Sequence, residues 1–395
     1  MKPLQHLTIL DLSRVLACPF ASMILAELGA TVIKVEQPGA GDETRGFEPQ
    51  LAKDSAYYFA CNRSKASITV NLRSDEGRRI IRELAQQADV FVENFPVGTL
   101  GRQGLDYATL SALNPKLVYV SCTGFGQTGP YAHKKGYDTV FQAMGGLMSL
   151  TGEKGGGPVK PGLPVADLTS GLWVAIAILA ALAGRGQTGR GAHVDFSMLD
   201  GQVSLLTLAA ARYFALGEVP PRLGTEHPGR VPSATFRCKD GKYAHITASD
   251  QHWQPLCAAL ELGEKLGSDP IYSTNAARVE HREGVMALLT EAVAKLTRAE
   301  LIAKLDAAEV PVGPVNDVAE VLADAQVRAR RMVGSFDYPG LGEFKALALP
   351  YKFLGWDDPQ IGRPPALGEH TDAILRERLG YSDEKIAELR KAKAV

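Results

Sequence analysis

The sequence predicts an α/β protein in which a large domain with a parallel β-sheet is joined to a smaller α+β domain. In the first half of the chain, short runs rich in β-branched residues alternate with helical segments, which is the pattern of right-handed βαβ units. The length of 395 residues exceeds what one simple core usually fills. A stretch rich in proline and glycine near residues 216–232 then separates the two predicted domains.

The large domain is expected to contain six strands. The first two are Leu7–Ser13 and Ala30–Glu36, with a helix near Pro19–Leu28 between them. The others are predicted at residues 66–72, 89–95, 116–124 and within 188–201, and residues 77–88 form an amphipathic helix. The longest apolar run, Leu172–Ala183, is interpreted as a buried core helix, because it is far shorter than the roughly 20 residues that span a bilayer.

The second half of the chain does not continue the alternation of strands and helices. Residues 233–249 are predicted as a β-hairpin that turns at Lys239-Asp240-Gly241, and helical segments follow to about Val310. The expected division is a large domain over residues 1–215, a linker over 216–232, a small α+β domain over 233–319, a return linker over 320–365, and C-terminal helices over 366–395 that rejoin the large domain.

Composition excludes several classes of function. The formal net charge of −1 provides no overall attraction to nucleic acid or to a membrane surface. Five scattered cysteines without a CxxC pair indicate reduced thiols rather than a disulfide framework or a zinc site. His193, His245 and His252 lack metal-ligand spacing, so no metal is expected. Because the N-terminal segment has no long apolar region, we expect a cytoplasmic protein, with the mitochondrial matrix also open to a processed chain.

Two features are typical of dinucleotide-binding sites, but the sequence around them does not fit such a site. Gly124-x-Gly126-x-x-Gly129 follows a predicted strand, as in dinucleotide-binding proteins, but Pro130 comes next instead of a helix. We interpret this stretch as a loop at the carboxyl edge of the sheet. Glu36 could bind a ribose hydroxyl, but without the glycines it is interpreted as a solvated strand end. A serine hydrolase is unsupported, because no G-x-S-x-G motif is present.

Basic residues follow several of the predicted strands. They are Arg63, Lys65, Arg73, Arg102, Lys134 and Lys135. Most such residues are simply solvated, but several of them at one edge of a sheet would form a local anion pocket in a neutral protein. Asn94 and Phe95 add an amide and an aromatic ring that could hold a purine or a pantetheine arm.

Asp167 is the only acidic residue in the segment GLPVADLTSGLWVAIAILAAL, residues 162–182. As a helix N-cap it would contribute about 1 kcal/mol and need no other role. The helix dipole would lower its pKa and keep it ionised, which suits a carboxylate nucleophile equally well. Chemistry alone favours the cap, because capping aspartates are far commoner than nucleophilic ones, and both interpretations stay open.

Five blocks of sequence occur in an order typical of one family. They are residues 10–45, beginning LDLSRV, 89–105 (DVFVENFPVGTLGRQGL), 124–138 (GFGQTGPYAHKKGYD), 164–200, beginning PVADL, and 367–372 (LGEHTD). Together they resemble the family III CoA-transferases of the CaiB/BaiF type, over nearly the whole chain. The resemblance implies a Rossmann-like large domain and a homodimer of two interlocked chains. It also implies acyl-CoA and small carboxylate substrates, with no tightly bound cofactor.

The resemblance further implies roles for individual residues. Asp167 matches the family's catalytic aspartate, which forms acyl-anhydride and aspartyl-CoA thioester intermediates. The residues at CoA-binding positions are Val15, Leu16, Gln37, Val70, Arg73, Asn94, Phe95, Arg102, Lys135, Tyr137, Asp138 and Met198.

Departures from the family pattern narrow the expected activity. Formyl-CoA transferases have a glutamine where Leu16 stands, an arginine where Gln37 stands, and a glycine-rich loop that this chain lacks before its small domain. The racemases of the family need a histidine where Tyr137 stands. We therefore expect a CoA-transferase that moves CoA, preferably from succinyl-CoA, to a small dicarboxylic acid. The alternatives are an acyl-CoA racemase, a formyl-CoA:oxalate-type transferase and a non-catalytic CoA-binding protein.

Overall fold

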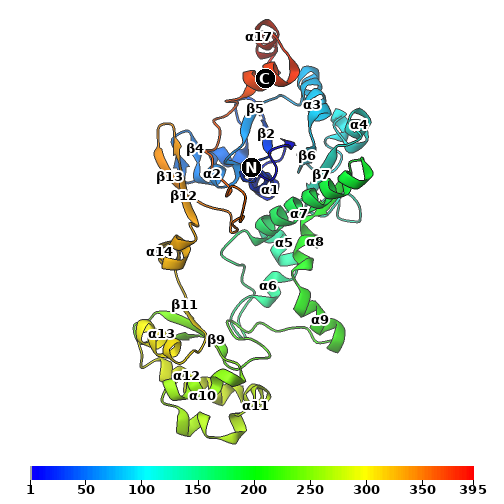
Figure 1. Ribbon diagram of the computed structural model, residues 1–395. Helices are drawn as coiled ribbons and strands as arrows, with labels where there is room; N and C mark the ends of the chain where they lie inside the picture. Colours follow the sequence, from blue (N-terminus) through cyan, green and yellow to red (C-terminus); the bar gives the residue numbers. More distant parts are fainter. Residues whose placement is uncertain (1) are drawn as a thin grey trace. The chain divides into compact units, whose positions relative to one another are not determined.

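The computed structural model describes residues 2–395, which divide into two compact units (Figure 1). The larger unit contains the segment ending at Leu147, Lys160–Ala211 and Gln326–Val395. The smaller unit contains Met148–Val159 and Arg212–Ala325. This division differs from the expected one in three ways, the first being that residues 216–232, expected as a linker, belong to the smaller unit. Residues 148–159 join the smaller unit, and most of the segment 320–365, expected as a return linker, joins the larger one.

A six-stranded parallel sheet organises the larger unit. Its strands are β1 (Thr8–Asp11), β2 (Thr31–Glu36), β5 (Ala66–Thr69), β6 (Val90–Glu93), β7 (Val118–Thr123) and β8 (His193–Ser197). Each coincides with a predicted strand, so this part of the prediction is confirmed. The spatial order is β5-β2-β1-β6-β7-β8. Numbered along the chain, this is the 3-2-1-4-5-6 order of Rossmann folds, which bind ligands where the winding reverses, at the carboxyl ends of the first and fourth strands.

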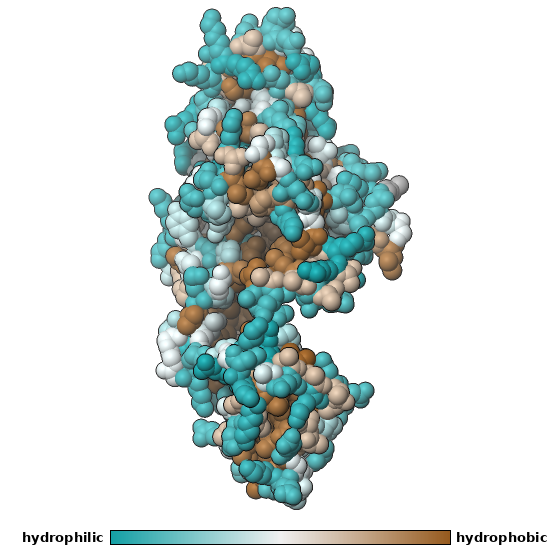
Figure 2. All heavy atoms as spheres, turned by 90° about the vertical axis from the view of Figure 1, so that its left-hand side faces the viewer, coloured by the Kyte–Doolittle hydropathy of each residue, from teal (hydrophilic) through white to brown (hydrophobic). Residues whose placement is uncertain are grey.

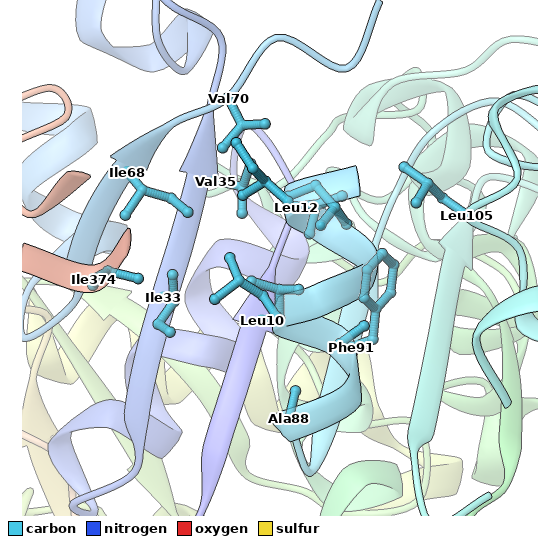
Figure 3. Packing of buried hydrophobic residues seen from close by; sticks show 14 of the residues in the cluster. Leu10, Leu12, Ile33, Val35, Ile68, Val70, Ala88, Phe91, Leu105 and Ile374 are labelled. Atoms are coloured by element: carbon cyan, nitrogen blue, oxygen red, sulfur yellow. The ribbon is translucent and has the colours of Figure 1, made fainter. Parts of the chain in front are cut away.

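Helices cover both faces of this sheet, because successive strand residues point to opposite sides. One face packs against α3 (Asp75–Gln87), α4 (Tyr107–Leu113), α16 (Thr371–Leu379) and α17 (Asp383–Lys391). Figure 3 shows side chains of this layer, including Leu10, Ile33, Ile68, Phe91 and Ile374. The opposite face, with Ile9 and Val32, packs against α1 (Ala17–Glu27) and α7 (Val165–Thr188).

Helix α7 is longer and more exposed than the sequence predicts. It has 24 residues and is long and apolar enough to cross a membrane by length and composition alone. Val174 and Ile178 pack in the core beside α1, whereas Leu172, Trp173 and Ile176 are 41–54% exposed. The prediction of a buried core helix is therefore confirmed for one side of α7 only. Hydrophobic residues also gather on the surface of the larger unit that Figure 2 presents.

The segment expected as a return linker contains an antiparallel hairpin, β12 (Val333–Tyr338) and β13 (Gly342–Leu347). It packs against α2 (Ala56–Asn62), whose Phe59 ring lies 4.5 Å from the Tyr338 ring and 5.8 Å from the Phe336 ring. Helix α15 (Ala325–Ala329) precedes this hairpin, and two short strands, β3 (Gln50–Leu51) and β4 (Asp54–Ser55), precede α2. The aromatic contacts explain why the hairpin belongs to the larger unit.

The smaller unit has its own core. The predicted hairpin is confirmed as β9 (Ser233–Arg237) and β10 (Tyr243–Thr247), and β11 (Val312–Pro314) pairs antiparallel with β10. Its helices are α10 (Asp250–Ala259), α11 (Asn275–Glu280), α12 (Arg282–Val293), α13 (Arg298–Ala307) and α14 (Val318–Ala323). Phe236, Ile246, Trp253 and Leu289 are among the buried residues that these elements share.

Candidate functional site

A cleft of about 240 Å³ lies at the carboxyl ends of β1, β2 and β5. Four predicted CoA-binding residues line it, Gln37, Val70, Arg73 and Phe95. They come from loops after three different strands, and the parallel sheet brings them to one edge. The lining also includes Arg14, Lys34, Asp42, Asn71 and Gln103. The cleft therefore combines an aromatic ring and apolar surface with exposed cationic groups.

The loop after β1 reaches this cleft in a strained conformation. Val15 has a φ of 70°, a value that β-branched residues rarely adopt and that costs on the order of 1–3 kcal/mol. Its N–H donates to Asp42 Oδ1 at 3.3 Å. The Asn94 side chain accepts from the Arg14 N–H at 2.9 Å and donates to the Arg14 carbonyl at 2.7 Å. Asn94 and Asp42 thus hold the loop from two sides.

A cluster of buried charges lies beneath this loop. Lys34 Nζ lies 2.8 Å from Asp42 Oδ2 and donates to the Ser13 carbonyl at 3.0 Å. Lys65 Nζ lies 3.1 Å from Asp11 Oδ2. Burial alone would raise the pKa of Asp11 and of Asp42, but the neighbouring lysines hold both pKa values below their usual range. Burial also lowers the pKa of Lys65 to about 8.

Three expectations about charged residues are wrong. Lys65 neutralises Asp11 and does not contribute to an anion pocket. Arg63 is likewise buried, with its Nε 2.9 Å from Glu27 Oε1. Glu36 is not a solvated strand end, because it is buried and accepts two hydrogen bonds from the Arg45 guanidinium at 2.8 and 2.7 Å. Among the proposed pocket cations, Arg73, Arg102, Lys134 and Lys135 remain exposed, and Lys134 Nζ lies over the Tyr131 ring, 3.7 Å from its centroid.

Asp167 lies in the first turn of α7 but does not cap it. The helix begins at Val165 after Pro164, and no side chain at the N-cap position accepts a hydrogen bond. Asp138, the first residue of α5 (Asp138–Met144), instead accepts from the Ala166 N–H at 2.8 Å and the Asp167 N–H at 3.2 Å. The capping interpretation of Asp167 is therefore wrong. Burial, together with the charge of Asp138, raises the pKa of Asp167 to about 7, although we expected the dipole to lower it.

Gly171 brings α7 close to α1. A Cβ atom at this position would lie 2.6 Å from the Ala17 carbonyl oxygen and 2.9 Å from the Phe20 ring, so no side chain fits between the helices. Asp167 lies one turn earlier on the same helical face. The first turn of α7, with Asp167, therefore precedes the close approach between α7 and α1.

The remaining predicted site residues lie around this region without lining the cleft. Tyr137 is 80% exposed and precedes Asp138 at the start of α5. Met198 is the first residue of α8 (Met198–Ser204) and packs against the core cluster that α1 and α7 share. Arg102 lies in the short 3-10 helix Gly101–Gln103 and Lys135 in the loop before α5, and both are exposed. Within residues 2–395, no group of His, Cys, Asp and Glu side chains has the arrangement of a metal site.

Sequence reasoning missed the residues that support the cleft from below. Besides Lys34 and Asp42, Glu93 accepts the Phe95 N–H at 2.7 Å, and burial raises the pKa of this carboxyl to about 7. One signal was available in the sequence. A charged residue inside a continuous apolar strand, as in VIKVE and VFVE, must be paired or hydrogen-bonded when the strand is buried.

Comparison with known proteins places this geometry in one family. The family described as CoA-transferase family III matches residues 4–371. A succinyl-CoA:glutarate CoA-transferase of Mus musculus is 40% identical over 390 residues, which cover 98% of this chain and 89% of the relative. A succinate–glutarate CoA-transferase of Agrobacterium fabrum is 39% identical over 383 residues, or 95% of each chain. A crystal structure of a CaiB/BaiF family protein from Brucella suis superimposes with a TM-score of 0.86 at 42% identity, covering 95% of this chain and 99% of that one. The chain therefore belongs to CoA-transferase family III.

Proposed function

We propose that this CoA-transferase moves CoA from succinyl-CoA to a small dicarboxylic acid, glutarate being the first candidate, through covalent intermediates on Asp167. The activities named for the mouse and Agrobacterium relatives support the substrates. The observation that carries the proposal is the placement of Asp167. Asp167 is a half-buried carboxylate in the first turn of α7, one turn before the close approach of that helix to α1 at Gly171.

The chemistry is a sequence of acyl transfers that returns Asp167 to its starting form. The Asp167 carboxylate attacks the donor thioester carbonyl, the C–S bond breaks, and CoA leaves as a thiolate. The thiolate attacks the aspartyl carbonyl of the resulting anhydride, which releases the donor acid and leaves an aspartyl-CoA thioester. The acceptor carboxylate attacks this thioester and expels the thiolate again. Attack of the thiolate on the acceptor carbonyl then yields the new acyl-CoA.

Residues of the cleft would hold the CoA portion of the substrate. Arg73 would contact its phosphates from the cleft, and Phe95 offers a ring for the adenine or the pantetheine arm. Arg102, Lys134 and Lys135 are exposed cations outside the lining that would reach the phosphates from the rim. The loop at Val15 and Leu16 would lead the pantetheine arm toward Asp167. Holding nucleophile and thioester in one geometry replaces an encounter in solution and accounts for a large part of the rate.

A transfer assay tests the proposal directly. The enzyme is incubated with a panel of acyl-CoA donors and carboxylic acids, and CoA is followed by mass spectrometry, with succinyl-CoA and glutarate expected among the best pairs. Asp167→Asn should lose at least about 10³-fold in kcat, because an amide is not a nucleophile. Hydroxylamine added during turnover should convert Asp167 to its hydroxamate. Asp200→Asn, an exposed acid in the first turn of α8, is the matched control and should retain activity.

Two results would contradict the proposal. Substantial transfer by Asp167→Asn would remove the nucleophile assignment. Exchange of the α-hydrogen of a 2-methylacyl-CoA with deuterated solvent would instead support the racemase alternative, which the tyrosine at position 137 argues against.

We also propose that the active form is a homodimer. The exposed face of α7, with Leu172, Trp173 and Ile176, is an apolar surface that a second copy of the chain would cover. Two interlocked chains could not separate without unfolding. Mass photometry at nanomolar protein should therefore show dimers only, and monomers that form on dilution would contradict interlocking.

A further inference from the structure

The start of α7 is capped by a side chain from another helix. Asp138 Oδ1 accepts hydrogen bonds from the backbone N–H groups of Ala166 and Asp167, at 2.8 and 3.2 Å. Pro164, at the local N-cap position, has no side chain that could accept either bond. Asp138 therefore satisfies two of the N–H groups that every helix leaves free at its first turn.

The orientation of Asp138 is fixed from its other side. Its Oδ2 accepts a hydrogen bond from Gln142 Nε2 at 2.6 Å, and the same amide donates to the Leu163 carbonyl at 3.3 Å. Gln142 is fully buried on α5, which packs against α7. The carboxylate of Asp138 is thus held in a closed set of contacts that joins α5, the segment before α7 and the backbone of Asp167.

We propose that Asp138 is a positioning residue that fixes the backbone of Asp167 and places a second negative charge beside the nucleophile. The inference rests on the proposed role of Asp167. It changes the role that resemblance implied for Asp138, from a contact with CoA to a contact with the nucleophile.

The second charge has a direct consequence for the chemistry. Two nearby carboxylates repel each other, and the repulsion ends when one of them becomes neutral. Acylation neutralises Asp167, because neither the anhydride nor the thioester carries its charge. Asp138 therefore disfavours the free Asp167 carboxylate relative to its covalent intermediates, and it helps to raise the pKa of Asp167 to about 7, after burial itself.

Other charges around Asp167 do not offset this repulsion. The helices packed against α7 are α1, α5 and α8, and strands β7 and β8 contact it as well. Cys18 in the first turn of α1 is a buried thiol whose pKa is raised well above its usual value, through its contact with Cys122 and through burial. Asp200 on α8 is exposed, and Lys135 precedes α5 in an exposed loop. Among the described residues, no ion pair links Asp167 or Asp138 to a cation.

The pH dependence of kcat/KM separates positioning from a purely structural role. For the unmodified enzyme we expect kcat/KM to rise with pH around a midpoint near 7, as Asp167 ionises. Asp138→Asn retains an oxygen that can accept the two backbone N–H groups but removes the charge. It should lower the midpoint by about one pH unit. Asp138→Ala should lower the midpoint similarly and also lower Tm more than Asp138→Asn does, because the cap is lost. Asp200→Asn should leave the midpoint unchanged.

A second measurement does not depend on activity. A water-soluble carbodiimide labels protonated carboxyl groups, and mass spectrometry can follow the labelling of Asp167 against pH. The midpoint of this labelling should also fall in Asp138→Asn. An unchanged midpoint in both assays would overturn the inference, as would a raised KM for acyl-CoA with no change of midpoint. If Asp167→Asn retained transfer, the proposed function would fail. The midpoint of carbodiimide labelling of Asp167, compared between the unmodified enzyme and Asp138→Asn, would still decide whether Asp138 raises the pKa of Asp167.

Discussion

The carboxylates under the CoA cleft and the carboxylate at the start of α7 are both removed from water, yet their surroundings are opposite. Asp11 and Asp42 each face a buried lysine, which keeps their pKa values low. Asp167 faces another acid, and its pKa rises to about 7. A carboxylate beside a lysine stays ionised and can hold a loop in place. A buried carboxylate without a cationic partner has an unfavourable free energy of ionisation, and acylation removes its charge. The contrast holds for Asp11 and Asp42. Glu93, also under the cleft, has no ion-pair partner among the described residues, and burial raises its pKa to about 7 as well.

Removing Asp42 should have the largest effect on stability. Asp42→Ala leaves Lys34 without its closest buried partner, which typically costs about 3–5 kcal/mol. It also removes the acceptor for the Val15 N–H, so the strained loop should relax and KM for acyl-CoA should rise. Chemical denaturation and steady-state kinetics measure the two effects. Asp42→Asn, which keeps an oxygen for Val15, should affect KM less.

Asp54→Asn is the matched control for that comparison. Asp54 is as buried as Asp42 and pairs with Arg45, but it does not touch the loop after β1. It should lower stability without raising KM for acyl-CoA. If Asp54→Asn raised KM for acyl-CoA as much as Asp42→Ala does, the specific link between Asp42 and the loop would be refuted.

Replacing Asp167 should raise the free energy of unfolding, whereas replacing Asp42 should lower it. Because its pKa is higher in the folded protein than the ordinary value near 3.8, its ionisation opposes folding above that value, and the full cost is reached above about pH 7. Asp167→Asn should therefore raise the free energy of unfolding at pH 8 by on the order of 2 kcal/mol. The gain should shrink steadily as the pH falls toward 4. Thermal unfolding at pH 8 and pH 5 checks this, and a destabilised variant at pH 8 would show that Asp167 has a favourable partner.

The exposed cations should give the smallest changes. Arg73→Ala should raise KM for acyl-CoA roughly tenfold, as expected for the loss of one charged contact to phosphate, and should leave Tm unchanged because the side chain is exposed. Arg102→Ala and Lys135→Ala should behave alike if they also reach the CoA phosphates. An unchanged KM in all three variants would remove phosphate binding from this edge of the sheet.

Much of the larger unit could be predicted because its signals are local. Each of the six strands is a short β-branched or apolar run, and the amphipathic pattern of α3 is visible in its own residues. The hairpin at Val333–Leu347 could not be predicted as part of this unit. It is held by contacts such as that of Tyr338 with Asp54, which lie 284 residues apart in sequence.

The same distinction applies to the site. Gln37 and Arg73 follow predicted strands, and Val70 and Phe95 lie near the carboxyl ends of predicted strands, so a parallel sheet brings all four to one edge. The roles of Asp138 and Lys65 depend on partners 28 and 54 residues away, and no local pattern marks these pairs. Asp167 resembled a helix cap for the same reason, because the residue that does the capping belongs to a different helix.

The contact at Gly171 has a consequence for how the substrate range of such enzymes can change in evolution. The backbone of α1 occupies the space that even one methyl group at this position would need, so any larger residue must push α7 away from α1. Asp167 would move with the helix, and under the proposed mechanism the gap between its carboxylate and the thioester would widen. The reach of the active site toward longer or bulkier acids can therefore change through a residue that no substrate touches.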